Sequence, residues 1–158
     1  MPTNLYGPGD NFDLNTSHVV PALMRKAHAA KLRGEKTITV WGTGSPRREF
    51  LHVDDCADAL VHLMQLYSGD QHINVGSGYD VTILELVKLV NSVVGFEGGI
   101  VHDLSKKDGR PRKLMSANKI RALGWAPKIY LPGGLASAYR AFLALSGLPR
   151  LEDVRQTE

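Results

Sequence analysis

Apolar positions along the chain switch several times between helical and extended spacing. A loop rich in Gly, Pro, Asn and Asp occupies residues 7–17. After it, apolar residues recur every three or four positions and predict a helix that Ser17 caps and Gly34 ends: Val20, Leu23, Met24 and Ala27. Runs of β-branched and aromatic residues then predict one strand at residues 37–41 and a second at 49–53.

The same alternation continues to the end of the chain. Asp54 or Asp55 is expected to cap a helix that follows the second strand. Thr82 and Glu85 have the spacing of a capping box ahead of another apolar helical stripe. The remaining expected elements are strands at 72–75 and near 99–102, helices near 116–123 and 132–145, and a frayed polar tail at 146–158.

Strands that alternate with helices predict an α/β fold. No strand is followed by Gly-x-Gly-x-x-Gly or Gly-x-x-Gly-x-x-Gly, the turn that holds a dinucleotide in this fold class. Gly76 and Gly78 follow an expected strand, but no third glycine stands at the required place, so we interpret them as a plain turn. The sequence therefore offers no dinucleotide cradle of its own.

Composition and charge exclude several classes of protein. The chain has 158 residues, a net charge of +3 and no apolar run near the roughly 20 residues of a membrane helix. That charge is too small to indicate nucleic acid, but it suits a small anionic ligand such as a nucleoside diphosphate. The single cysteine, Cys56, is interpreted as a small buried hydrophobe, and we expect a reducing, cytoplasmic setting.

Few residues suggest chemistry without further context. The histidines have no spacing typical of a metal site, and none is expected. Asp54 and Asp55 are adjacent, so their carboxylates should diverge and cannot act as an acid/base pair. His18 stands where a helix begins, and an imidazole can donate or accept a proton near neutral pH. It is either a proton-transfer residue or a helix-start residue that bonds to backbone.

One set of motifs resembles the extended short-chain dehydrogenase/reductases, which act on nucleotide sugars. Pro2-Thr3-Asn4-Leu5-Tyr6-Gly7-Pro8 is similar to their Asn-x-Tyr-Gly-Pro segment. Three further segments follow in the same order: Arg48-x-Phe50-x-His52-Val53-x-Asp55, Asn74-Val75-Gly76, and Leu123-Gly124-Trp125-x-Pro127 with Gly134-Leu135. The resemblance implies that residues 1–6 end the last strand of a Rossmann sheet, while residues 7–145 form a substrate-binding α/β domain.

Two stretches narrow the resemblance to the GDP-L-fucose synthases. These are residues 10–23, with Ser17-His18-Val19-Val20-Pro21, and residues 107–113, with Lys107-Asp108-Gly109-x-Pro111-Arg112-Lys113. Gly9 and Ser116 depart from that family's pattern, and residues 146–158 match nothing in it. Members epimerise GDP-4-keto-6-deoxy-D-mannose at C3 and C5 and then reduce C4 with NADPH, so the resemblance implies NADP(H) and a GDP-sugar as ligands.

The resemblance also assigns roles to particular residues. It makes His18 the proton donor or acceptor, facing a catalytic cysteine that this chain lacks. Pro2, Thr3, Asn4 and Leu5 would lie along the nicotinamide together with His18. The residues implied in substrate binding are Lys26, Trp41, Arg48 and Asp108. Trp41 can instead belong to the core, and Asp108 can instead only form a turn. Arg25 and Arg47 are expected to point elsewhere than Lys26 and Arg48.

No Tyr-x-x-x-Lys, the proton-supplying pair of these reductases, occurs in the sequence. We therefore expect the chain to be the C-terminal half of such an enzyme, or the product of a truncated gene, and to be inactive in reduction by itself. The resemblance also implies that the full-length enzyme is a homodimer. Two alternatives remain open: part of another nucleotide-sugar epimerase or dehydratase, and a non-enzymatic module that binds a nucleotide sugar.

Overall fold

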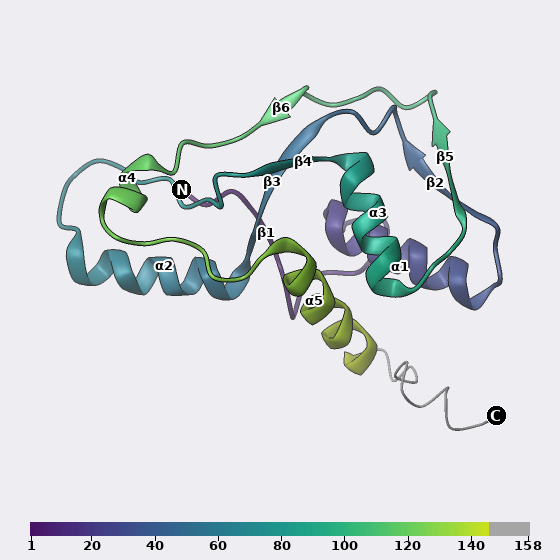
Figure 1. Cartoon of the computed structure of the whole chain (residues 1–158), viewed down its shortest axis with the longest axis horizontal. Helices are drawn as coiled ribbons and strands as arrows, with labels where there is room; N and C mark the ends of the chain where they lie inside the picture. Colours follow the sequence, from purple (N-terminus) through teal and green to yellow (C-terminus); the bar gives the residue numbers. More distant parts are fainter. Residues whose placement is uncertain (146–158) are drawn as a thin grey trace.

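The computed structural model describes residues 1–145; the expected frayed tail, 146–158, lies outside the described residues. The chain is α/β, as its pattern predicts (Figure 1). Its strands and helices, in order, are β1 (Asn4–Tyr6), α1 (Val19–Leu32), β2 (Thr37–Trp41), β3 (Arg47–His52), α2 (Val53–Leu66), β4 (Asp80–Thr82), α3 (Ile83–Val94), β5 (Gly99–Asp103), β6 (Arg112–Lys113), α4 (Asn118–Ala122) and α5 (Leu131–Leu145).

Strand β3 organises the larger of two sheets. Its second half pairs in parallel with β1, where Asn4 lies opposite Phe50. Its first half pairs with antiparallel β4 and with parallel β6. The smaller sheet is the parallel pair β2 and β5, in which Trp41 lies opposite Asp103. Trp41 ends β2 and Arg48 is the second residue of β3, so the short segment 42–46 that joins the two strands links these two candidate residues.

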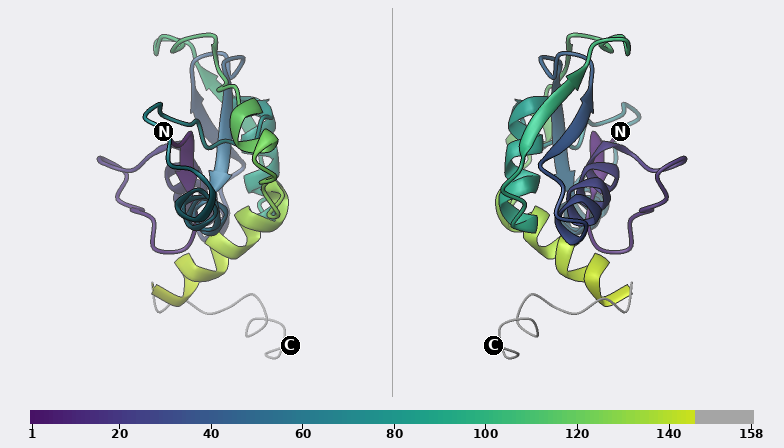
Figure 2. Two further views of the ribbon diagram at one scale, coloured as in Figure 1. Left: turned by 90° about the vertical axis from the view of Figure 1, so that its left-hand side faces the viewer. Right: turned by 90° about the vertical axis from the view of Figure 1, so that its right-hand side faces the viewer.

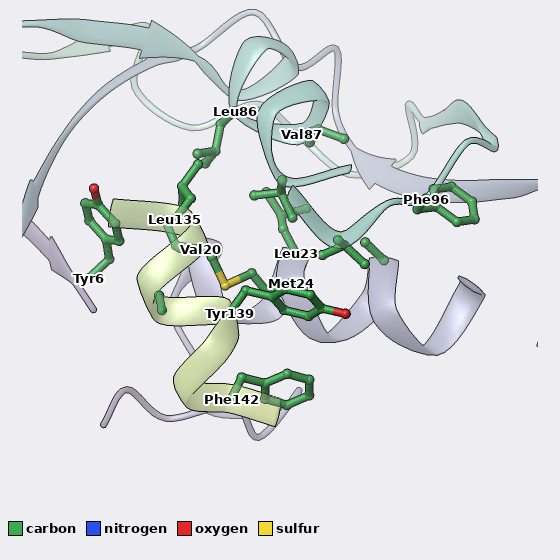
Figure 3. Packing of buried hydrophobic residues seen from close by; sticks show 14 of the residues in the cluster. Tyr6, Val20, Leu23, Met24, Leu86, Val87, Phe96, Leu135, Tyr139 and Phe142 are labelled. Atoms are coloured by element: carbon green, nitrogen blue, oxygen red, sulfur yellow. The ribbon is translucent and has the colours of Figure 1, made fainter. Parts of the chain in front are cut away.

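Two apolar cores hold the elements together. The larger lies among α1, α3 and α5, where Met24, Leu86 and Leu135 are fully buried (Figure 3). The smaller lies between α2, β3 and α4, around Leu51 and Ile120. Figure 2 shows α3 on one side of the molecule and β1 with α1 on the other, while α5 crosses beneath them. Helix α2 therefore packs on its own core, away from the other long helices.

The predicted helix starts are correct in position but partly wrong in chemistry. The capping box of Thr82 and Glu85 is confirmed at α3. Ser17 does not cap α1, because its backbone N–H donates to the Asp13 carbonyl at 2.8 Å and so places it in the preceding turn. The N-cap residue of α1 is His18, whose side chain makes no capping bond. Helix α1 ends at Leu32, two residues before Gly34, which has a φ of 63°.

Neither aspartate caps α2, contrary to the prediction. The N-cap residue is His52, whose Nδ1 accepts the backbone N–H of Asp54 at 3.2 Å. The Asp55 carboxylate turns away and accepts the backbone N–H groups of Lys128 and Ile129, at 3.1 and 2.9 Å. It thereby ties α2 to the segment that leads into α5, while the carboxylate of Asp54 stays exposed.

Three further differences concern strands. Strand β3 begins at Arg47 and ends at His52, because Val53 already starts α2. Residues 72–75 pair with the chain through a single bridge, between Pro2 and Val75, rather than as a strand. Strands β4 and β6 were not expected; they have three and two residues, too few for a period-two pattern to show.

Candidate functional site

An exposed tryptophan marks one end of the molecule. Trp41 ends β2 and has 64% of its surface exposed, so its alternative placement in the core is wrong. The Lys26 Nζ lies 5.0 Å from the centre of its ring, and the Lys106 Nζ lies 5.5 Å from it. Lys26 comes from α1 and Lys106 from the loop after β5, so three separate segments build one cationic aromatic surface. Both distances are within the range of cation–π attraction.

Asp108 fixes the turn beside this tryptophan. Its Oδ1 accepts the backbone N–H of Thr43 at 3.0 Å, and its Oδ2 accepts the Thr43 hydroxyl at 2.7 Å. Gly42 leaves room for this contact, because a Cβ there would clash with the Asp108 carboxylate, and its φ of 71° favours glycine in any case. Asp108 therefore stabilises the turn that follows Trp41 at the end of β2.

Arg48 contacts the loop that carries Asp108 through a hydrogen bond to the Arg110 carbonyl. Its Nη1 donates to the carbonyls of Arg47 and Arg110, both at 2.7 Å. Arg48 also lines a cavity of about 570 Å³, together with Phe50, Arg121 and Tyr130. Within the described residues only Nη1 is used in a hydrogen bond, so the other edge of the guanidinium stays free for an anion.

The neighbouring arginines are held in other ways. Arg47 donates from Nε to Asp80 at 2.9 Å, and Arg112 bonds the other oxygen of the same carboxylate. The hydrogen bond from Arg112, supported by Arg47, lowers the pKa of Asp80 below its ordinary value. Arg25 donates to the Phe12 carbonyl at 2.8 Å. Arg47 and Arg25 thus point elsewhere than Arg48 and Lys26, as predicted.

His18 stands at the start of α1 and is exposed; its carbonyl accepts the backbone N–H of Ala22 at 3.0 Å, while its side chain makes no capping bond. Lys26 follows eight residues later on the same helix, which places the two residues about 12 Å apart along its axis. Next to His18, the buried Ser17 hydroxyl has no hydrogen-bond partner among the described residues. A polar group from outside these residues would satisfy it.

The residues expected along a nicotinamide lie apart from the tryptophan. Thr3 donates its backbone N–H to Val75 at 3.0 Å, and the Asn4 amide donates to the Glu49 carbonyl at 2.8 Å. Pro2, Asn4 and Leu5 are exposed, and β1 stands at the end of its sheet's strand order. The structure thus gathers Lys26, Trp41, Arg48 and Asp108 at one end and leaves Pro2–Leu5 as a separate edge.

One member of this surface was missed in the sequence. Lys106 belongs to a run of basic residues, and nothing in the sequence distinguishes it from the other lysines of that run.

Across residues 1–145, no three His, Cys, Asp or Glu side chains gather as a metal site would require. Nor does any helix in that range have the length and apolar character to cross a membrane. Cys56 is buried as predicted, and burial raises the pKa of its thiol.

Comparison with known proteins places these features in a family. Residues 1–76 match the model of the NAD dependent epimerase/dehydratase family. The chain is 59% identical over 143 residues to GDP-L-fucose synthase 1 of Arabidopsis thaliana, covering 90% of this chain and 44% of that protein. It is 50% identical to GDP-L-fucose synthase of Escherichia coli (strain K12), over 90% of this chain and 47% of that protein. The chain thus spans about half the length of the curated relatives it matches.

Solved structures agree with that placement. A GDP-L-fucose synthetase from Naegleria fowleri bound to NADP superimposes with a TM-score of 0.86 at 30% identity, over 92% of this chain and 46% of that one. A GDP-6-OMe-4-keto-L-xylo-heptose reductase from C. jejuni does so with a TM-score of 0.83 at 34% identity, over 91% and 53%. Both are similar to this chain over less than the whole of their own length.

Proposed function

The chain belongs to the GDP-L-fucose synthase family of the NAD-dependent epimerase/dehydratase superfamily, and we propose that it is the C-terminal part that binds the GDP-sugar. On this proposal residues 7–145 are the substrate-binding domain and residues 1–6 end the last strand of a dinucleotide-binding sheet. The whole enzyme would epimerise GDP-4-keto-6-deoxy-D-mannose at C3 and C5 and reduce C4 to give GDP-L-fucose.

The observation that carries the proposal is the exposed Trp41 ring with two lysine ammonium groups near it. A purine stacks well on an indole, and each stacked base contributes about 1–3 kcal/mol in proteins that bind nucleic acid. Lys26 and Lys106 have long flexible side chains, so either can move from the ring to a phosphate oxygen. The free edge of Arg48 would take two oxygens of the diphosphate.

His18 would act at the sugar. A C4 keto group acidifies the hydrogens at C3 and C5, and inversion requires a proton to leave one face and return to the other. An exposed imidazole can hold or give that proton near neutral pH. With the base on Trp41 beside Lys26, the distance along α1 to His18 suits an extended sugar nucleotide. The second proton-transfer group would lie outside this chain.

The chain would supply only one side of the NADP(H) site. Pro2–Leu5 would lie along the nicotinamide, with His18 beyond them, and the open edge of β1 fits this role. NADPH, when bound, supplies the hydride for C4. Because the sequence has neither the glycine-rich turn nor Tyr-x-x-x-Lys, we propose that the chain alone binds GDP-sugar without reducing it.

Calorimetric titration of the purified chain with GDP and with UDP tests this function. GDP should bind, UDP should bind more weakly, and NADPH mixed with the keto-sugar should not be oxidised by the chain alone. The absence of GDP binding, or protein-dependent NADPH turnover, would contradict the proposal. The C. jejuni reductase supports an alternative sugar, a GDP-heptose, which an assay of the two keto-sugars on an enzyme of full length would distinguish.

A further inference from the structure

The cavity of about 570 Å³ that Arg48 lines is separate from the Trp41 surface, which consists of Lys26, Trp41, Lys106 and Asp108. None of these four residues lines it. Its lining comes from β3, β4 with the turn before it, α3, α4 and the segment 126–132. Its volume is in the range of small-molecule sites, about 300–1,000 Å³. Most of the lining is apolar and includes Phe50, Val81, Leu89, Ile129 and Leu131.

The ionised groups around this cavity are all cations. Arg48 and Arg121 line it, and no Asp or Glu belongs to the lining that the described part of the chain provides. Arg48 already gives Nη1 to two backbone carbonyls, at 2.7 Å each. An apolar lining keeps water away from such groups and so strengthens their attraction for a negative charge. The cavity therefore favours an anion over a neutral or cationic ligand.

Arg121 is held in place by contacts that leave part of its guanidinium free. Its Nη2 donates to the Ser77 carbonyl at 2.8 Å. Its Cζ lies 5.8 Å from the centre of the Tyr79 ring, within the range of cation–π attraction. Gly78 leaves the space that the guanidinium occupies, because a Cβ there would clash with it. No other side-chain nitrogen of Arg121 bonds to a residue in the range 1–145, so its remaining N–H groups can donate to an anion.

Two exposed tyrosines line the same cavity. Tyr79 has 74% of its surface exposed and Tyr130 has 83%, whereas Phe50 is buried. Aromatic and apolar side chains around a cavity favour a flat apolar ligand, because its rings can pack against theirs. An inorganic anion would leave this apolar lining in contact with water, and an uncharged ring would leave the free side of Arg121 without a partner.

We propose that this cavity binds a small aromatic carboxylate, with the ring against the apolar lining and the carboxylate on Arg121. A carboxylate is planar like the guanidinium, and its two oxygens accept N–H groups from it. One negative charge suffices, because the Arg48 guanidinium already has carbonyl partners. This site is distinct from the proposed GDP site, and it does not depend on the proposed function.

Calorimetric titration of the 158-residue chain with 2-naphthoate measures this binding. The probe carries both parts of the proposed ligand, whereas acetate lacks the ring and 2-naphthol lacks the carboxylate. We expect 2-naphthoate to bind at least about tenfold more tightly than either, because burial of the ring and the charge-assisted bond each contribute that much. The absence of 2-naphthoate binding, or equally tight binding of 2-naphthol, would overturn the proposal.

Variants of the lining locate the ligand. Arg121→Gln removes the guanidinium and should weaken 2-naphthoate binding by about tenfold or more. Lys119→Gln is the matched control, since Lys119 is also an exposed cation on α4 but does not line the cavity. Ala126→Trp places a large ring in the lining and should abolish binding. Wild-type affinity in Arg121→Gln or in Ala126→Trp, or an equal loss in Lys119→Gln, would overturn the proposal.

Two further measurements separate this site from misfolding and from the GDP site. Tyr130→Ala changes an exposed side chain, so it should fold like the wild type and weaken 2-naphthoate binding by about two- to tenfold, even if Arg121→Gln does not fold. Excess GDP should not displace 2-naphthoate; displacement would place the probe in the proposed GDP site and overturn the separate one. A chain that binds 2-naphthoate but not GDP contradicts only the proposed function.

Discussion

The buried carboxylate of Glu49 accepts the backbone N–H of Gly78 at 2.7 Å. Its second oxygen accepts the backbone N–H of Met115 at 3.1 Å. One side chain in the middle of β3 thus anchors the turn after residue 75 and the segment that precedes α4. Gly76 permits this arrangement, because a Cβ there would lie 2.5 Å from the Glu49 carboxylate. Since Arg48 directly precedes Glu49 in β3, the same anchor fixes the backbone of the proposed diphosphate site.

Glu49→Gln should therefore destabilise the chain without removing any apolar contact. The amide can accept from only one of the two backbone donors, and the other is left buried and unpaired. Loss of a hydrogen bond to a charged group costs about 1.5–3 kcal/mol, so we expect a loss of about 2 kcal/mol in the free energy of unfolding. Urea denaturation measures it, with Glu97→Gln, an exposed glutamate, as control. Equal midpoints for both variants would show that Glu49 is no anchor.

Acid should weaken the ion pair between Asp80 of β4 and Arg112 of β6. The pKa of Asp80 is lowered by its bonds to Arg112 and Arg47, so its contribution to stability is present above the ordinary value of 3.8 and is lost as pH falls below it. Asp80→Asn has no carboxylate to protonate, so it should be less stable at pH 7 and lose less stability below pH 3.8. Melting temperatures from pH 7 downward check this; parallel curves for the two proteins would refute it.

His18→Gln should impair epimerisation and little else. A general acid–base group contributes typically about 10²–10⁴-fold in rate. In a fusion that joins this chain to the remaining part of Arabidopsis GDP-L-fucose synthase 1, exchange of solvent deuterium into C3 and C5, followed by NMR, should slow by that order. GDP affinity should stay as it is, because His18 is about two turns of α1 from Lys26. The exposed His72 supplies the control as His72→Gln. Unchanged exchange in His18→Gln would show that His18 has no role in proton transfer and is only the N-cap residue of α1.

Arg48→Lys keeps the charge and removes the planar fork. The ammonium cannot bond the Arg47 and Arg110 carbonyls while it also takes two phosphate oxygens, as the guanidinium can. GDP affinity measured by calorimetry should fall about tenfold or more. Arg110→Lys, on the exposed loop, should bind GDP like the wild type. If Arg48→Lys also binds like the wild type, the diphosphate lies elsewhere.

The parts of this structure that sequence predicts are those decided locally. The capping box of Thr82 and Glu85 needs only its own helix turn, and it is correct. The cap assigned to Asp54 or Asp55 failed because His52 is the N-cap residue of α2 and the Asp55 carboxylate bonds a segment distant in the sequence. Asp55 serves residues 128 and 129, more than seventy positions away.

The candidate site divides in the same way. The family resemblance suggested Trp41 and Lys26 as ligand contacts, but only the pairing of β2 with β5 shows that Lys106 joins them. Arg112 bonds the Asp80 carboxylate, whereas within the described residues Arg48 uses only Nη1 in hydrogen bonds. Which of several arginines is free to bind a phosphate depends on the residues that its side chain contacts in the folded chain. These contacts cannot be inferred from spacing along the sequence.

Binding of the GDP part of the sugar nucleotide by the Trp41 surface can be measured in one titration. GDP is titrated by calorimetry into the wild type, Trp41→Ala and Tyr130→Ala; Tyr130 is another exposed aromatic residue, in the lining of the cavity that Arg48 also lines. Loss of a stacked base costs about 1–3 kcal/mol, so Trp41→Ala should weaken binding by about tenfold or more, while Tyr130→Ala should match the wild type. Unchanged affinity in Trp41→Ala, or a loss confined to Tyr130→Ala, would contradict the account.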